Sequence, residues 1–135
     1  MWVCLFSSVH AQNSVVVTIR NVESRSGVVQ ACIFNSAASF TGDSGTPLQC
    51  TQAPITGKEA RVQFNGLPDG RYAIFVFHDA NNNRKLDKNF IGIPTEGYGA
   101  SRNNLPFAAA PSFDDNAFSL KGNISARITI RLRNI

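Results

Sequence analysis

The stretch from Arg71 to Asp79, RYAIFVFHD, limits the fold more than any other part of this sequence. It contains six consecutive apolar residues, and a run of turn-forming residues, Asn65–Gly70, comes directly before it. Neighbouring side chains of a strand point to opposite faces, so both faces of this strand would be apolar. We therefore predict a central strand that other parts of the chain cover on both sides. One face carries Tyr72, Ile74 and Val76, and the other carries Ala73, Phe75 and Phe77.

Six further segments have the β-branched or alternating apolar residues of strands, with Gly, Pro, Asn and Asp residues between them. No stretch combines helical periodicity with capping residues. Short strands at this spacing predict an all-β protein, a single antiparallel β-sandwich over residues 12–135. The predicted strands are Ser14–Val22, Val28–Asn35, Leu48–Ile55, Glu59–Phe64, Ala117–Leu120 and Ile124–Leu132.

Length and composition fit one domain, because 135 residues with 43% hydrophobic content can build a core. No apolar run approaches the length of a membrane-spanning helix, so no transmembrane segment is expected. The net charge is +4, and Arg127, Arg131 and Arg133 alternate with apolar residues in the last strand. This basic stripe indicates either a solvated outer face or an anion-binding face. We expect no nucleic-acid partner, because no basic and aromatic surface motif is present.

Residues 1–11, MWVCLFSSVHA, have a short apolar stretch followed by the VHA pattern of a signal-peptidase site after Ala11. We interpret them as the remainder of an export signal, which predicts a periplasmic or secreted protein; the alternative is a weakly hydrophobic N-terminus. Cys4 would leave with the signal. An oxidising compartment then favours a disulfide between Cys32 and Cys50 over two buried free thiols. It would close a loop of about 18 residues and stabilise the fold by roughly 3 kcal/mol.

The segment from Ala80 to Asn116 has little strand signal and many Gly, Pro, Asn and Asp residues. A structureless segment of this length inside a compact domain is usually functional or covers something. We expect it to form a long capping loop over the second face of the central strand, burying Phe75 and Phe77. The predicted apolar anchors of this cover are Phe90, Phe107 and Phe113.

The first part of that segment places oxygen-bearing residues at positions 1, 3, 5, 7 and 9 of a loop, the spacing of a calcium site. Two positions depart from an EF-hand-type loop: Arg84 stands at the glycine position and Phe90 at the bidentate glutamate position. The alternative is an Asx-turn network in which the side chains hydrogen-bond their own backbone. The candidate calcium ligands are Asp79, Asn81, Asn83 and Asp87, the backbone carbonyl of Lys85, and Glu96 as a further ligand.

His78 ends the central strand beside these residues. With Asp79 or Glu96 as its carboxylate partner it could act as a general base, which would make the protein a hydrolase. The alternative is a histidine whose hydrogen bonds fix the loop. The sequence has no nucleophile elbow and no histidine pair for zinc. We therefore predict a non-enzymatic protein, with the hydrolase as the alternative.

The run LPDGRYAIFVFHDANNNRKLDKNFIGIPTEGYGASRNN, followed by PSFDDNAF, resembles the bacterial domain-of-unknown-function family 2141. The resemblance rests on a Leu-Pro-x-Gly-x-Tyr-Ala motif, a His-Asp-x-Asn-x-Asn motif and a Gly-x-Pro-x-Glu-Gly-x-Gly-x-Ser motif. Asn82 and Arg84 depart from it, since the family often has glycine there. The resemblance implies an exported bacterial protein with an immunoglobulin-like or transthyretin-like sandwich, and it implies no activity.

These observations lead to one functional hypothesis, a non-enzymatic exported module that binds an unidentified envelope protein or small ligand through the Asp79–Ser101 loop, with calcium as a stabilising ion. A purely structural envelope protein is the other alternative to the hydrolase. A binding module predicts a concave surface beside the loop, an enzyme predicts an exposed His78, and a structural protein predicts a buried one. The residues expected to contact the ligand are His78, Asn89, Glu96, Tyr98 and Ser101.

Overall fold

The computed structural model describes residues 12–40, 45–85, 96–107 and 109–134. The regular elements in this part of the chain are strands apart from one helix of four residues, and no described helix is long enough to cross a membrane. The elements are β1 Asn13–Arg20, β2 Val28–Phe34, β3 Gln49–Ala53, β4 Ala60–Leu67, β5 Gly70–Asp79, β6 Tyr98–Ala100, α1 Phe113–Asn116, β7 Phe118–Leu120 and β8 Ser125–Arg131.

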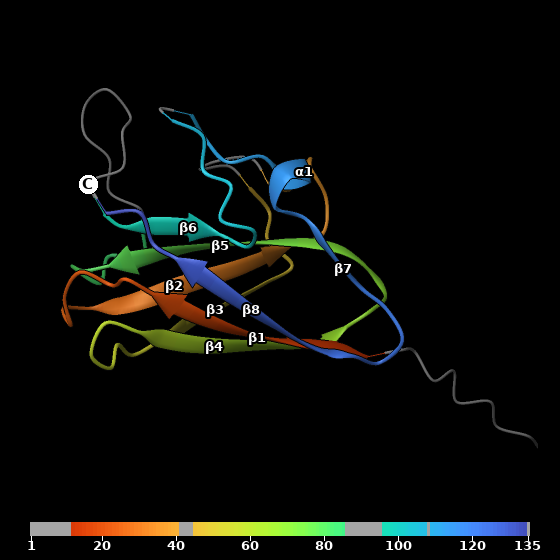
Figure 1. The fold of residues 1–135 in the computed structure, drawn as a ribbon, viewed down its shortest axis with the longest axis horizontal. Helices are drawn as coiled ribbons and strands as arrows, with labels where there is room; N and C mark the ends of the chain where they lie inside the picture. Colours follow the sequence, from red (N-terminus) through yellow and green to blue (C-terminus); the bar gives the residue numbers. More distant parts are fainter. Residues whose placement is uncertain (1–11, 41–44, 86–95, 108, 135) are drawn as a thin grey trace, which may run out of the picture.

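Two sheets form the layers of a β-sandwich (Figure 1), which confirms the predicted fold class. The first sheet has the order β4-β1-β8, and the second has the order β3-β2-β5-β6, with β7 also paired to β5. As predicted, the apolar strand β5 is central, because it pairs with β2 on one side and with β6 and β7 on the other.

One pair of strands departs from the antiparallel pairing predicted for the sandwich. β1 and β8 are parallel and stay in register from Ser14 opposite Ser125 to Arg20 opposite Arg131. A parallel pair needs a long crossover between its strands. Here the rest of the domain supplies that crossover, because β1 and β8 lie at opposite ends of the sequence.

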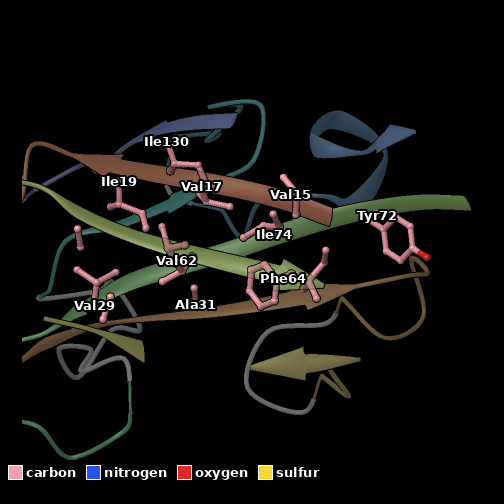
Figure 2. Close-up of a cluster of buried hydrophobic side chains, with 14 of the residues drawn as sticks. Val15, Val17, Ile19, Val29, Ala31, Val62, Phe64, Tyr72, Ile74 and Ile130 are labelled. Carbon is pink, nitrogen blue, oxygen red and sulfur yellow. The ribbon is translucent and has the colours of Figure 1, made fainter. Parts of the chain in front are cut away.

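The core lies between the two sheets, where alternate residues of the strands face inward. The side chains of Val15, Val17 and Ile19 on β1 are fully buried, and so are Ile74 and Val76 on β5. Figure 2 shows side chains from both sheets meeting in this layer. The β-branched residues that predicted the strands are therefore also the residues that hold the sheets together through burial of apolar surface.

A second, smaller cluster lies on the other face of β5, where Phe113 and Ala117 pack on Ala73. The helix α1 holds Phe113 there, and it begins where the Ser112 hydroxyl accepts a hydrogen bond from the Asp115 amide. This confirms Phe113 as an anchor of the cover.

The rest of the predicted cover differs from the structure. Phe107 is 96% exposed, so its prediction as an anchor is wrong, and Phe90 lies outside the described residues. Phe75 and Phe77 are half-buried, and the ring of Tyr98 lies 6.1 Å from that of Phe75. The segment expected to lack structure also contains β6 and α1.

The predicted disulfide is present between Cys32 of β2 and Cys50 of β3. The two cysteines are direct partners in the antiparallel register, and their sulfur atoms lie 2.06 Å apart. The bond therefore ties the edge strand β3 to the sheet. Residues 1–11, including Cys4 and the predicted export signal, lie outside the described residues.

Candidate functional site: the loop that follows the central strand

The loop after β5 is closed at its base by hydrogen bonds between its two ends. The His78 amide donates to the Gly97 carbonyl at 2.8 Å, and the Ala80 amide donates to Oε2 of Glu96 at 2.9 Å. Glu96 is thus a backbone-capping residue at the point where the chain returns to the sheet. Residues 86–95, which include the predicted site residues Asp87 and Asn89, lie outside the described residues.

Asp79 organises the outgoing half of this loop. Its side chain is fully buried at the end of β5. Oδ1 accepts a hydrogen bond from the Asn83 amide at 3.0 Å, and Oδ2 accepts one from the Arg84 amide at 2.8 Å and one from Nε2 of Gln30 at 3.1 Å. A buried carboxylate is stable only when such donors replace water. Asp79 therefore fixes the turn and ties it to β2.

Asparagine side chains continue the same pattern outward. Oδ1 of Asn81 accepts a hydrogen bond from the Asn83 amide at 3.3 Å, and Oδ1 of Asn83 accepts one from the Lys85 amide at 3.0 Å. These are the i to i+2 bonds of an Asx-turn network. The predicted network of side chains bonded to their own backbone is therefore present.

The tight turn forms although it has no glycine. Asn82 and Arg84, which stand where the resembled family often has glycine, have φ values of 56° and 63°. This left-handed region is accessible to asparagine but costs other residues roughly 1–2 kcal/mol. The two hydrogen bonds that the Asp79 carboxylate accepts from the backbone of the turn help to hold Arg84 in this conformation.

The expected calcium ligands are brought together only in part. Asp79, Asn81 and Asn83 share one turn, and their side-chain oxygens accept the backbone hydrogen bonds described above. Within the described ranges no three histidine, cysteine, aspartate or glutamate side chains are grouped as a metal site requires. Calcium binding therefore stays a prediction that experiment must test.

His78 is 3% exposed, and its Nε2 lies 2.7 Å from the Ser26 carbonyl oxygen. A carbonyl can only accept, so Nε2 carries the proton in this contact. The neighbouring Gly27 packs against the end of β5, because a Cβ atom there would lie 1.9 Å from the Asp79 carbonyl oxygen. The hydrolase alternative requires an exposed imidazole, whereas this burial matches a histidine that fixes the loop.

Two other residues expected to contact a ligand are also buried. The ring of Tyr98 packs beside Phe75, and its backbone pairs with Arg133. The Ser101 hydroxyl accepts a hydrogen bond from the Ile74 amide at 3.0 Å and donates one to the Asn116 carbonyl. Both residues therefore hold the scaffold. The exposed surface of the described loop consists of residues 80–85.

Asn116 is a scaffold residue for which sequence reasoning assigned no role. Its buried side-chain oxygen accepts hydrogen bonds from the Arg102 and Asn104 amides, and its nitrogen donates to the Asn104 and Ser112 carbonyls. A buried amide with four backbone partners is fully satisfied. The signal that could have found it is the S-x-x-D helix start at Ser112, since such a start predicts a short helix here.

A surface hollow lies at the opposite end of β5 from the loop. It is lined by Asn35, Leu48 and residues 68–72. Beside it the pKa of Asp69 is lowered, first by the hydrogen bond from the Asn13 side chain, then by the Gly122 amide and by the charge of Lys121. Burial and the Asp69 charge raise the pKa of Tyr72. This hollow is therefore not the concave surface that was expected beside the loop.

Comparison with known proteins places the chain in a family. No curated protein and no solved structure gave a match. The model of one family, described as "Uncharacterized protein conserved in bacteria (DUF2141)", matches residues 17–128, which include the loop, α1 and all strands except the beginning of β1 and the end of β8. This agrees with the resemblance carried by the Leu67–Ser101 motifs, and the chain belongs to the family DUF2141.

Proposed function

We propose that this protein is an exported, non-enzymatic β-sandwich module, periplasmic or secreted, that binds a partner through the loop after β5. The observation that carries the proposal is the fixed base of that loop. Its ends are bonded to each other, and the buried Asp79 holds the turn. Loops held on a rigid sandwich are the usual place for binding residues, because their exposed side chains are presented in one conformation.

The exposed side chains favour a protein partner over an enclosed small ligand. Residues 80–85 offer three asparagine amides, a guanidinium and an ammonium group, all exposed. The hollow lined by Asn35, Leu48 and residues 68–72 lies at the other end of the domain. An exposed turn of polar side chains fits the surface of a partner better than it encloses a small molecule.

Site-specific crosslinking in the cell tests this proposal. A photo-crosslinking amino acid replaces Lys85 in the loop, and in the control it replaces the exposed Lys121 at the opposite end of the domain. We expect one discrete crosslinked envelope partner from position 85 and none from position 121. The same product from both positions, or none from either, would contradict a specific role of the loop. Fractionation and N-terminal sequencing test export, with Gln12 as the expected first residue.

Calcium is the second part of the proposal. Support comes from Asp79, Asn81 and Asn83 sharing one turn, with Arg84 in the left-handed conformation that a calcium loop needs at its sixth position. An ion that binds the folded state raises the melting temperature in a saturable way. We expect a shift of several degrees between EDTA and millimolar calcium. Equal melting temperatures, or an equal shift in Asp79→Ala, would refute the metal site.

A structural envelope role is the second candidate, favoured by the burial of His78 and its bond to the Ser26 carbonyl. In that case the loop is a cover that no partner contacts. The crosslinking experiment separates the two candidates, since a structural role predicts no discrete product from position 85.

A further inference from the structure

Basic residues gather where the segment after β6 lies along the edge of β8 that faces away from β1. The side-chain amide of Asn103 donates to the Thr129 carbonyl at 3.2 Å, and its oxygen accepts a hydrogen bond from the Arg131 amide at 2.9 Å. These bonds join residues 101–107 to β8, the outer strand of the first sheet (Figure 1). We name this surface the basic edge, and it consists of the exposed residues Arg102, Phe107, Arg127, Arg131 and Arg133.

The basic edge has a uniform sign of charge. Neither 97–107 nor 121–134 contains an aspartate or glutamate. Among the described residues none of the four arginines forms an ion pair. Glu96 binds the Ala80 amide, and Asp115 lies next to the edge because its carbonyl accepts a hydrogen bond from the Asn104 side chain. The four arginines outnumber these two carboxylates, so the edge has a net positive charge that can attract an anionic partner.

Phe107 adds an apolar group to the basic edge. A single exposed apolar side chain is common on protein surfaces. This one is 96% exposed, and the guanidinium of Arg133 holds the backbone just before it. Its two terminal nitrogens donate to the Leu105 carbonyl at 2.7 Å and to the Pro106 carbonyl at 3.1 Å. Arg133 is thus a positioning residue that fixes the backbone next to the exposed ring of Phe107.

We propose that the basic edge docks on the surface of an anionic phospholipid bilayer, with Phe107 entering the headgroup region. Arginines near such a surface attract anionic headgroups, and an aromatic side chain is favoured at the interface between lipid and water. Two weak signals of this kind together give reversible membrane binding. The proposal is independent of the loop after β5, and the anionic lipid can belong to either face of a bacterial membrane.

The same surface fits other polyanions less well. Single-stranded nucleic acid needs several stacking aromatic side chains, whereas the basic edge has one. A fluid lipid surface needs no fixed spacing of the charges, so four arginines and one ring suffice.

Co-sedimentation of the full chain with lipid vesicles tests the proposal. The vesicles contain phosphatidylcholine alone or with 30 mol% phosphatidylglycerol (about one anionic lipid in three). We expect binding to the anionic vesicles that weakens strongly between 0.05 and about 0.5 M salt, because the charges are exposed. Residues 1–11 are shared by all variants, so differences between variants report on the folded surface.

The decisive variant is Arg102→Gln/Arg127→Gln/Arg131→Gln, because these side chains make no described hydrogen bond that the fold would lose. Each arginine contributes about fivefold to the partition coefficient, so we expect a loss of roughly 100-fold. The control Arg25→Gln/Lys58→Gln/Lys121→Gln removes the same charge from exposed turns elsewhere. The partition coefficient of this control should fall by less than about fivefold. That of Phe107→Ser should fall about tenfold, and its dependence on salt concentration should stay the same.

Three outcomes would overturn the proposal. The first is no preference of the wild type for anionic vesicles. The second is an equal loss in the two triple variants, which would mean that net charge alone acts. The third is tighter binding to a single-stranded oligonucleotide than to the vesicles at the same salt concentration.

Discussion

Replacement of Asp79 by asparagine tests whether one buried carboxylate fixes the loop. The substitution keeps the size and shape of the side chain and replaces one acceptor oxygen by an NH2 group. In the wild type Oδ1 accepts one hydrogen bond, from the Asn83 amide, and Oδ2 accepts two, one from the Arg84 amide and one from Nε2 of Gln30. At least one of these donors would therefore face another donor.

The expected cost follows from these contacts. A hydrogen bond to a charged acceptor contributes about 1.5–3 kcal/mol, and an asparagine that points its oxygen toward Arg84 and Gln30 loses the bond to Asn83. The Asn83 and Arg84 residues are exposed, so water can replace part of the loss. We expect Asp79→Asn to lower the free energy of unfolding by about 2 kcal/mol and the melting temperature by about 7 °C.

Urea unfolding measures the change, and hydrogen exchange shows its location. The Asn83 and Arg84 amides should exchange faster in the variant, whereas the amides of β1 should change only with global stability. Asp114→Asn is the matched control, since its carboxylate is 80% exposed and lies 3.7 Å from the Arg71 guanidinium. Its expected cost is below about 0.5 kcal/mol. Equal costs for the two substitutions would refute the assigned role of Asp79.

Three further predictions concern the scaffold. Gly27→Ala should lower the stability measured by thermal melting by at least about 3 kcal/mol, because the added Cβ would collide with the backbone at the end of β5. Gly57 has a similar positive φ but open space around it, so Gly57→Ala should cost about 1 kcal/mol, and equal costs would contradict the collision. Replacing both Cys32 and Cys50 by alanine should lower the free energy of unfolding by about 3 kcal/mol, since their disulfide closes a loop of 18 residues. An unchanged urea midpoint would show that β3 is held in the sheet without the disulfide. The pKa of Asp69 is lowered in the folded state, so its carboxylate stabilises the fold above its ordinary pKa of 3.8, and that stability is lost as pH falls through the lowered value. Asp69→Asn should therefore be less stable than the wild type at pH 7, and a difference that does not shrink as the pH falls below 3.8 would refute this origin.

The strands were predictable because their residues face two environments in regular alternation. β1 and β4 bury every second residue over most of their length, and β5 is apolar on both faces because it lies between the main core and the smaller cluster under α1. These patterns are local, so they can be read along the chain. The parallel pairing of β1 with β8 is not local, because it depends on where two distant strands meet.

The candidate site was predictable in its position and not in its details. Residue types located the Asx turns around Asp79, but burial decides what each side chain does. Tyr98 and Ser101 were expected to contact a ligand and are buried, because β6 continues the sheet and the Ser101 hydroxyl bonds the backbone of β5. The strand β6 has only three residues with a glycine in the middle, and this pattern is too short to predict a strand. Phe107 shows the converse, since nothing in its local sequence distinguishes an exposed phenylalanine from a core one.

The parallel pairing of β1 and β8 sets an order of events during synthesis. The partners Ser14 and Ser125 are separated by 111 residues, and a bacterial ribosome adds about 5–20 residues per second. Between roughly 6 and 22 seconds therefore pass before β1 can acquire its second neighbour. Over that interval the apolar side of β1, which includes Val15, Val17 and Ile19, lacks the strand that completes its sheet. One edge of β1 is thus unpaired and accessible to a chaperone until nearly all of the domain has left the ribosome.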